Sequence, residues 1–445
     1  IYTAGLNTYK AGLQFMQTGL YDLSEFKDNC GFGLIAHIQG KASHRVLKTA
    51  IEALTCMTHR GGIASDGKTG DGCGLLLQKP DSFMRDIATS LFDIKLPELY
   101  AIGSVMLSQN KDHRRNAKIT MEKNLHDQGL EIVGWRKVPT NNDCLGEIAL
   151  KTIPVMEQIF ITAGNLDKKN FNARLFVAKR KSEIELVSDN SFYIASLAEN
   201  IISYKGLMMP VDLPKFYLDL GNPSLETAIC IFHQRFSTNT SPKWPLAQPF
   251  RMLAHNGEIN TLAGNRNWSL ARTPKLKTTL LPDLQEVTPL VNNTGSDSSS
   301  LDNMLEFMVA GGMDLHKAVR MLVPPAWDNN QEFGIEERAY FEYMAMHMEP
   351  WDGPAGIVIT DGRYAVCTLD RNGLRPSRWV LTNDDIITVA SEIGVYGYDP
   401  KNVTAKGRLG PGDMLSIDTI SGAIMNAAQI DKELASANPY QAWLN

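Results

Sequence analysis

The chain has 445 residues, of which 43% are hydrophobic and 21% are charged, and its net charge is −5 from 44 basic and 49 acidic residues. This balance is typical of a globular protein and excludes a disordered or fibrous chain; without a basic excess, nothing indicates a nucleic-acid or anionic-membrane partner. No apolar run approaches the roughly 20 residues that span a bilayer, and the length fits about three domains or one large sandwich domain with insertions.

The N-terminal part of the chain predicts a strand, a helix and a second strand. Residues 30–38 are glycine-rich and apolar, which is typical of a buried strand. Ser43 is expected to cap a helix in which apolar residues recur at helical spacing as far as Met57, and Gly61-Gly62 is expected to end it. A short strand follows at 74–78, and helical and strand-like stretches interleave from about 100 to 225.

The second half of the chain predicts helices between two strand-rich regions. Buried strands are expected over 227–236 and 250–255, and helices from Leu301 onward, near 314–323 and near 335–348. Five further strands are expected over residues 356–360, 364–369, 379–381, 386–390 and 413–417. Because no βαβ period is visible, this order favours α+β layers over a doubly wound sheet.

The cysteines indicate a reduced compartment. Six are spread along the chain and none belongs to a C-x-x-C pair. We therefore expect a cytoplasmic protein with free thiols. Residues 1–29 have neither the basic nor the apolar region of a secretory signal. Cys56 and His59 have metal-like spacing, but no second Cys/His pair follows, so we predict no metal site.

Six short segments combine polar residues and glycine inside apolar surroundings. They are Asn29-Cys30-Gly31, His59-Arg60-Gly61, His233-Gln234-Arg235-Phe236-Ser237-Thr238, His255-Asn256-Gly257-Glu258, Gly295-Ser296-Asp297-Ser298 and Asp370-Arg371-Asn372-Gly373. No single segment is specific; Asn256-Gly257 alone could be a hairpin turn. The informative signal is their order and their spread along the chain.

These segments belong to longer motifs, and with them the sequence resembles the N-terminal glutamine amidotransferase domain of bacterial glutamate synthase large subunits. The motifs are DNCGFGLIAHIQG (28–40), HRGG (59–62), DGKTGDGCGLLLQKP (66–80), FHQRFSTNTSPKWPLAQPFRMLAHNGEINTLAGNR (232–266), NNTGSDSSSLDN (292–303), PPAW (324–327), MHMEPWDGPAG (346–356) and LDRNGLRPSRW (369–379). The resemblance implies an α+β fold, a four-layer αββα N-terminal-nucleophile hydrolase sandwich with insertions. It also implies a leader or pro-segment over 1–29, a class II glutamine amidotransferase domain over 30–430, and the start of a connection to a further domain over 431–445.

The resemblance also implies an activity. The chain is expected to hydrolyse L-glutamine to L-glutamate and ammonia through a cysteinyl thioester, and the complete enzyme to pass the ammonia to a distant FMN site that aminates 2-oxoglutarate. The implied partners are the remaining domains of the large subunit and a small NADPH-oxidising subunit. FMN, a [3Fe–4S] cluster and NADPH are implied for the complete enzyme, and no cofactor is expected in this chain. The alternatives are the glutaminase domain of another class II amidotransferase, or a non-catalytic, unprocessed module of the same fold.

Cys30 stands at the position of the family nucleophile. A thiolate suits a poor electrophile such as a carboxamide. In the family this cysteine is the first residue of the mature chain, and its α-amino group, with a pKa near ~8, acts as the base. In the sequence given, 29 residues precede Cys30, so hydrolysis is expected only after their removal. The alternative for an isolated cysteine is a buried structural thiol.

The remaining site residues also follow from the resemblance. The Asn256 amide and the Gly257 backbone N–H are expected to stabilise the oxyanion. Arg235 is expected to bind the α-carboxylate of glutamine and Asp297 its α-ammonium, and Arg60 is expected near the nucleophile. The structural alternatives are an ion pair within a strand pair for Arg235, a helix N-cap or Asx-turn for Asp297, and a helix C-cap cluster for Arg60.

Overall fold

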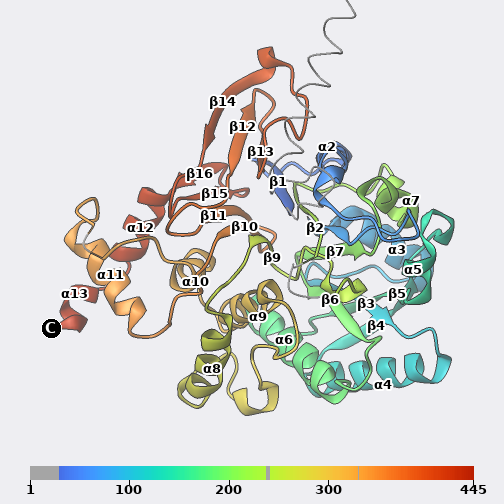
Figure 1. The fold of residues 1–445 in the computed structure, drawn as a ribbon. Helices are drawn as coiled ribbons and strands as arrows, with labels where there is room; N and C mark the ends of the chain where they lie inside the picture. The colour runs from blue at the N-terminus through green and yellow to red at the C-terminus, as the bar shows by residue number, and fades with distance from the viewer. Residues whose placement is uncertain (1–29, 237–240, 329) are drawn as a thin grey trace, which may run out of the picture.

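The structure, a computed structural model, describes residues 30–236, 241–328 and 330–445 (Figure 1). The expected leader and Ser237-Thr238 of the HQRFST motif lie outside the described residues. Within the described part, the strands form three sheets whose neighbouring strands are all antiparallel. The largest contains, in spatial order, β14 (Val403–Arg408), β12 (Arg378–Thr382), β13 (Ile386–Ala390), β1 (Gly31–His37), β8 (Ile229–Gln234), β2 (Cys73–Gln78) and β7 (Ile201–Gly206).

The other two sheets have five and four strands. The five-stranded sheet contains β16 (Ala423–Asn426), β15 (Met414–Asp418), β11 (Tyr364–Leu369), β10 (Ala355–Thr360) and β9 (Leu253–Gly257). The four-stranded sheet contains β4 (Glu131–Lys137), β5 (Val155–Thr162), β3 (Tyr100–Leu107) and β6 (Tyr193–Ala198).

Helices surround these sheets. They are α2 (His44–Cys56), α3 (Asp81–Phe92), α4 (Lys111–Asp127), α5 (Glu147–Lys151), α6 (Lys168–Glu185), α7 (Leu213–Phe216), α8 (Leu262–Arg272), α9 (Asp297–Ala310), α10 (Leu315–Leu322), α11 (Ile335–Ala345), α12 (Ala427–Ser436) and α13 (Tyr440–Leu444).

The seven- and five-stranded sheets pack face to face. Alternate residues of β1 point into the space between them, so that Phe32 and Leu34 meet Val358 of β10 and Cys367 of β11 in one buried cluster. This alternation follows from the two-residue period of a strand. The core of the sandwich therefore lies directly behind the strand that begins one residue after Cys30.

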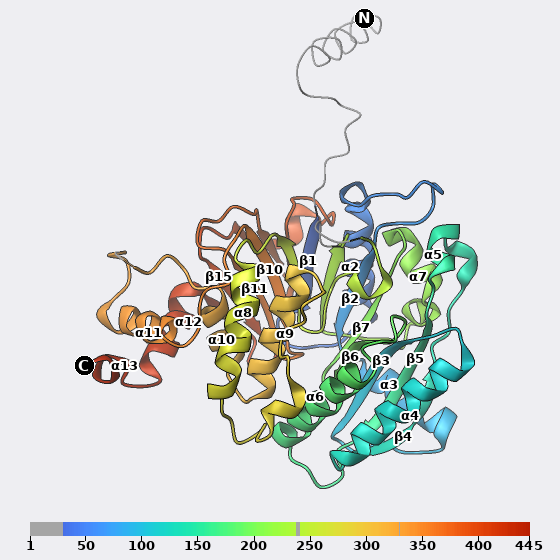
Figure 2. The same ribbon diagram turned by 60° about the horizontal axis from the view of Figure 1, so that its bottom comes forward.

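Helices cover both outer faces of this sandwich. On the seven-stranded sheet, Val46 and Leu47 of α2 pack with the outward residue Ile35 of β1. On the five-stranded sheet, α9 and α10 pack with Ile357 and other outward residues of β10, and Figure 2 shows these helices in front of β10 and β11. The predicted four-layer αββα sandwich is thus confirmed.

The third sheet is an insertion between β2 and β7. Helices α4 and α6 cover one of its faces, with Met121 and Phe171 buried against the strands. Its other face joins the outer core of the large sheet through Ile102 and Phe160. This sheet accounts for most of the mixed pattern in residues 100–225.

Several predicted boundaries differ from the observed ones. Ser43 caps α2, but the helix ends at Cys56 and the 3₁₀ turn Thr58–Arg60 follows, so the glycines at 61–62 do not end it. Helix α9 begins at Asp297, earlier than its first apolar residue indicates. The domain boundary after residue 430 stays a prediction; residue 430 lies in α12, whose Asp431 forms a buried ion pair with Arg320 of α10.

Candidate active site

Cys30 lies at the end of the central strand pair of the large sheet. It precedes β1, which runs between β13 and β8, and the register places Gly31 opposite Gln234. Continuing that register by one residue brings Arg235 beside Cys30. The Cys30 Sγ is 3.8 Å from the Phe236 carbonyl oxygen. The sheet therefore fixes the thiol next to the predicted carboxylate-binding arginine.

Burial dominates the electrostatics of this thiol. It raises the pKa of Cys30 to about 11; Arg235 and Arg375 act to lower it, and Asp71 and Asp297 act to raise it. In the chain as described, the thiol is therefore protonated at neutral pH. A base is needed before it can attack a carboxamide.

This pKa predicts the pH dependence of Cys30 alkylation while residues 1–29 are attached. Because the pKa is raised, the thiolate fraction is small at pH 7 and increases steadily up to about pH 11. Iodoacetamide modification of Cys30, followed by peptide mass spectrometry, is expected to accelerate across this range. A rate that reaches its plateau below pH 8 would contradict the prediction.

Asn256 and Gly257 reach the same point from the other sheet. They end β9, where they pair with Gly356 and Ala355 of β10. The Asn256 Nδ2 atom donates a hydrogen bond to the Cys30 carbonyl oxygen at 2.8 Å, across 226 positions of sequence. The structure thus brings the predicted oxyanion-binding pair next to the predicted nucleophile.

Only glycine fits at position 257. Its φ is +141°, in a region that side chains disfavour. A Cβ atom there would lie 1.7 Å from the Pro354 carbonyl oxygen. Consequently the Pro354 carbonyl fills the side where any other residue would carry its Cβ, and the absence of a side chain lets the end of β9 pack directly against the segment before β10.

Helix α9 holds β9 from both ends. The Asp302 carboxylate accepts hydrogen bonds from the backbone N–H groups of Arg251, Met252 and Leu253, at 2.8 to 3.3 Å. Asp297 accepts one from Ile259 N at 2.9 Å, just beyond the strand. The two carboxylates therefore position the intervening Asn256-Gly257 segment.

Asp297 is the first residue of α9, and it is buried. Its neighbour Ser296 provides the N-cap by accepting from Ser299 N, so the N-cap alternative for Asp297 is wrong. The Asp297 carboxylate also accepts from the Ser298 hydroxyl at 3.2 Å and lies 3.7 Å from His255 Nδ1. A buried carboxylate in this position can bind a cationic group of a ligand.

Arg235 is held in a strained conformation. Its φ is +93°, which is uncommon for a residue with a side chain and is found mostly at functional sites. Its N–H donates to the Gly72 carbonyl oxygen at 2.6 Å, and its Nε lies 3.1 Å from the Asp71 carboxylate. Asp71, which sequence reasoning did not select, thus orients the guanidinium.

The Asp71 contact predicts opposite effects on substrate binding and on the thiol. In Asp71→Asn, Arg235 loses the charged partner that lies 3.1 Å from its Nε, so we expect the KM for glutamine to rise roughly tenfold, which corresponds to about 1.4 kcal/mol. The pKa of Cys30 is expected to fall, because Asp71 acts to raise it. Steady-state kinetics and the alkylation profile test both effects, with the exposed Glu98→Gln as a charge-matched control. Unchanged KM would contradict the role of Asp71.

Arg60 lies beside the nucleophile strand but is bound to another residue. Its Nε lies 2.6 Å from Glu392 Oε1, and His59 lies 3.3 Å from the other oxygen of the same carboxylate. A Cβ at Gly31 would be 3.4 Å from the Arg60 Cγ. Arg60 belongs to a 3₁₀ turn after α2 rather than to a C-cap of that helix.

His233 and Gln248 connect the two sheets at the site. His233 contacts the Arg235 carbonyl oxygen at 2.8 Å through Nδ1 and the His255 carbonyl oxygen at 3.2 Å through Nε2. Burial lowers the pKa of His233 to about 3, so its neutral ring has one N–H to donate to either carbonyl. Gln248 binds both the N–H and the carbonyl of His255. The only sequence signal for these residues is a polar side chain within or beside an apolar strand.

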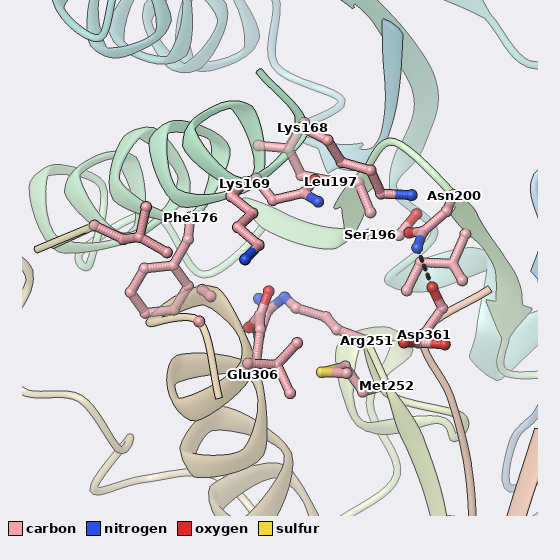
Figure 3. Close-up of a pocket in the computed structure, with 17 residues that line it drawn as sticks. Lys168, Lys169, Phe176, Ser196, Leu197, Asn200, Arg251, Met252, Glu306 and Asp361 are labelled. Atoms are coloured by element: carbon pink, nitrogen blue, oxygen red, sulfur yellow. Dashed lines mark hydrogen bonds and ion pairs between the residues drawn. The ribbon is translucent and has the colours of Figure 1, made fainter. Parts of the chain in front are cut away.

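A cavity of about 370 Å³ lies apart from this cluster, among α6, α9 and β6 (Figure 3). Lys168, Lys169, Arg251 and Glu306 project around it, and none of the predicted site residues lines it. Arg251 links the two regions, since its backbone N–H is one of the groups that Asp302 binds. The cavity therefore borders the segment that leads into β9, not the nucleophile.

Among the residues that the structure describes, no group of three or more His, Cys, Asp or Glu side chains is placed to hold a metal ion. In the same part of the chain, no helix is both long and apolar enough to cross a membrane.

Comparison with known proteins gives the family. Residues 30–443 match the model of class II glutamine amidotransferases. The chain is 42% identical to the glutamate synthase [NADPH] large chain of Bacillus subtilis, over 96% of this chain and 28% of that protein. It is 40% identical to the ferredoxin-dependent glutamate synthase of Pyropia yezoensis (95% and 28%) and 39% identical to the NADH glutamate synthase of Schizosaccharomyces pombe (96% and 21%). The chain thus spans less than a third of the length of these relatives.

Similar solved structures have low identity to this chain. An allosteric regulatory enzyme of purine biosynthesis aligns with a TM-score of 0.40 and 11% identity, over 89% of this chain and 48% of that one. The glutamine phosphoribosylpyrophosphate amidotransferase of B. subtilis aligns with a TM-score of 0.30 and 13% identity, over 73% and 48%. By the match over residues 30–443 and the identity to glutamate synthases, the chain belongs to the class II glutamine amidotransferases.

Proposed function

We propose that this chain is the glutaminase part of a glutamate synthase and converts L-glutamine and water to L-glutamate and ammonia. The observation that carries the proposal is the 2.8 Å hydrogen bond from Asn256 to Cys30, which joins the predicted oxyanion-binding segment to the predicted nucleophile. Identity to glutamate synthases over almost the whole chain favours a glutamate synthase over another class II amidotransferase as the enzyme that contains this glutaminase part.

In the first step, the Cys30 Sγ attacks the carboxamide carbon of glutamine. The thiol proton passes to the α-amino group of Cys30, which is free only when Cys30 is the first residue. The oxyanion is stabilised by the Gly257 N–H and by the Asn256 Nδ2, which keeps a second N–H after binding the Cys30 carbonyl. Collapse of this intermediate transfers the proton to the departing ammonia and leaves a γ-glutamyl thioester.

In the second step, water attacks the thioester. The same α-amino group takes a proton from the water, and the thiol regains it as glutamate leaves. Arg235, oriented by Asp71, binds the α-carboxylate, and Asp297 binds the α-ammonium. Arg60, paired with Glu392, lies beside the start of β1, where its Cγ would be 3.4 Å from a Cβ built at Gly31.

Removal of residues 1–29 is part of this proposal. While the peptide bond before Cys30 is intact, its nitrogen is an amide and cannot accept a proton. The raised pKa of the Cys30 thiol makes an added base necessary at neutral pH. An unprocessed chain is therefore expected to be inactive. A chain that is never processed would correspond to the alternative of a non-catalytic module of the same fold.

The wider enzyme supplies the rest of the reaction. We propose that the ammonia passes to a distant FMN site of further domains, with a [3Fe–4S] cluster and a small NADPH-oxidising subunit. The relatives include NADPH, NADH and ferredoxin types. The assignment of NADPH as the electron donor therefore rests on the similarity to the NADPH type alone. We assign the protein to the cytoplasm, consistent with its six free cysteines.

Intact mass spectrometry with a diazoketone analogue of glutamine tests the proposal. A species that begins at Cys30 and gains one adduct on that residue is expected, together with ammonia release from glutamine. If the chain begins at Cys30 but takes up no adduct and releases no ammonia, the glutaminase assignment is wrong. If residues 1–29 stay attached in the active protein, the assignment of the α-amine as base is wrong.

A further inference from the structure

Arg375 projects from a loop that is fixed against the oxyanion-binding segment. This loop follows β11 and is organised by the Asp370 carboxylate, which accepts hydrogen bonds from the N–H groups of Ala355, Asn372 and Leu374, at 2.9 to 3.2 Å. Ala355 is the residue of β10 that pairs with Gly257. The loop is therefore anchored directly behind Gly257.

The side chain of Arg375 starts between the two sheets, beside Gly356 and Phe32. A Cβ built at Gly356 would lie 3.3 Å from the Arg375 Cβ and 2.9 Å from the ring of Phe32. Gly356 is opposite Asn256 in the β9–β10 pair, and Phe32 is two residues after Cys30. Arg375 thus occupies the place where the strand of the nucleophile faces the strand of the oxyanion-binding pair.

The charge of Arg375 is not neutralised within the described residues. Its Nε is buried and has no hydrogen-bond partner there, whereas Arg371 of the same loop lies 3.1 Å from Asp352. The other charged groups that act on Cys30 are engaged: Arg235 with Asp71, and Asp297 with the Ile259 N–H. A partly buried guanidinium without a counter-ion favours a negative charge nearby.

We infer that Arg375 is a further electrostatic residue of the glutaminase site, stabilising the negative charge that develops on the Cys30 sulfur and on the tetrahedral intermediate. The inference rests on the proposed function. The proton removed from the thiol still passes to the α-amino group, and Arg375 itself transfers neither a proton nor an electron pair. Consistent with this placement, Arg375 acts to lower the pKa of the Cys30 thiol and that of His255.

The test compares Arg375→Gln with Arg375→Lys, and uses Arg371→Gln as the matched control from the same loop. Iodoacetamide modification of Cys30 is followed as a function of pH by peptide mass spectrometry, and glutamine hydrolysis is measured in parallel. In Arg375→Gln, we expect the alkylation midpoint to rise by about one pH unit, so that the rate at a fixed lower pH falls roughly tenfold. The kcat for glutamine is expected to fall at least as much, with KM changed less. Arg375→Lys should restore most of the alkylation rate, and Arg371→Gln should behave as wild type.

Two results would overturn the inference. One is an alkylation profile of Arg375→Gln that coincides with that of the wild type. The other is a KM effect with unchanged kcat, which would make Arg375 a substrate-binding residue. If Arg375→Gln does not fold, as judged by thermal unfolding, Arg375→Met is read in the same way. Failure of the proposed function gives a different result: the wild type itself would not release ammonia, while the alkylation comparison would remain measurable.

Discussion

Replacing Cys30 with alanine is expected to abolish glutamine hydrolysis and labelling by the glutamine analogue. The alanine variant has no nucleophile, so no thioester can form, whatever the oxyanion-binding pair contributes. Loss of a catalytic nucleophile commonly costs about 10⁴-fold or more in kcat. Ammonia release under saturating glutamine and intact mass after incubation with the analogue measure the two effects.

The fold should survive this change. Cys30 is half-buried, and its sulfur makes a weak contact of 3.8 Å with the Phe236 carbonyl oxygen. Thermal unfolding of Cys30→Ala should therefore resemble that of the wild type. Cys56→Ala, which removes an exposed thiol at the end of α2, is the matched control and should keep full activity. Activity in Cys30→Ala, or its loss in Cys56→Ala, would assign the nucleophile elsewhere.

Short-range patterns in the sequence predict many of the elements that carry this site. The apolar run from residue 30 predicts β1. The N-cap Ser43 and the apolar residues that follow it at helical spacing predict α2. Elements with weak patterns are missed. Strand β14 alternates half-buried and exposed residues without strong apolar side chains, and α8 has only two buried residues, both polar.

The geometry of the site depends on contacts that no local pattern encodes. Asp302 binds backbone N–H groups about 50 positions away, and Arg60 pairs with Glu392, 332 positions away. A carboxylate in a helix commonly faces solvent. Only the packing of α9 on β9 places Asp302 where it accepts hydrogen bonds from backbone N–H groups. The resemblance could select Arg235, but the identity of its partner Asp71 follows from the loop before β2 folding back onto the end of β8.

The second large effect is expected for Asn256→Ala. This change removes an oxyanion donor and, with it, the 2.8 Å hydrogen bond that holds the Cys30 carbonyl. Loss of one such donor costs about 10²–10³-fold in kcat. Because the α-carboxylate and α-ammonium contacts stay in place, KM should change by much less. Initial rates of ammonia release over a range of glutamine concentrations separate the two parameters.

Two further variants define the chemistry at position 256. Asn256→Asp keeps the shape but replaces the N–H donors with a negative charge, so its kcat should fall below that of Asn256→Ala, because like charges repel. Asn260→Ala removes an exposed amide just beyond β9 and should behave as wild type. If Asn256→Asp matched the wild type, neither N–H of the Asn256 side chain would be needed for catalysis, because an aspartate can donate neither to the Cys30 carbonyl nor to the oxyanion, and Gly257 N–H would be left as the sole assigned oxyanion donor. The order of the three rates therefore shows whether catalysis depends on the N–H donors of Asn256 and on the absence of a negative charge at this position.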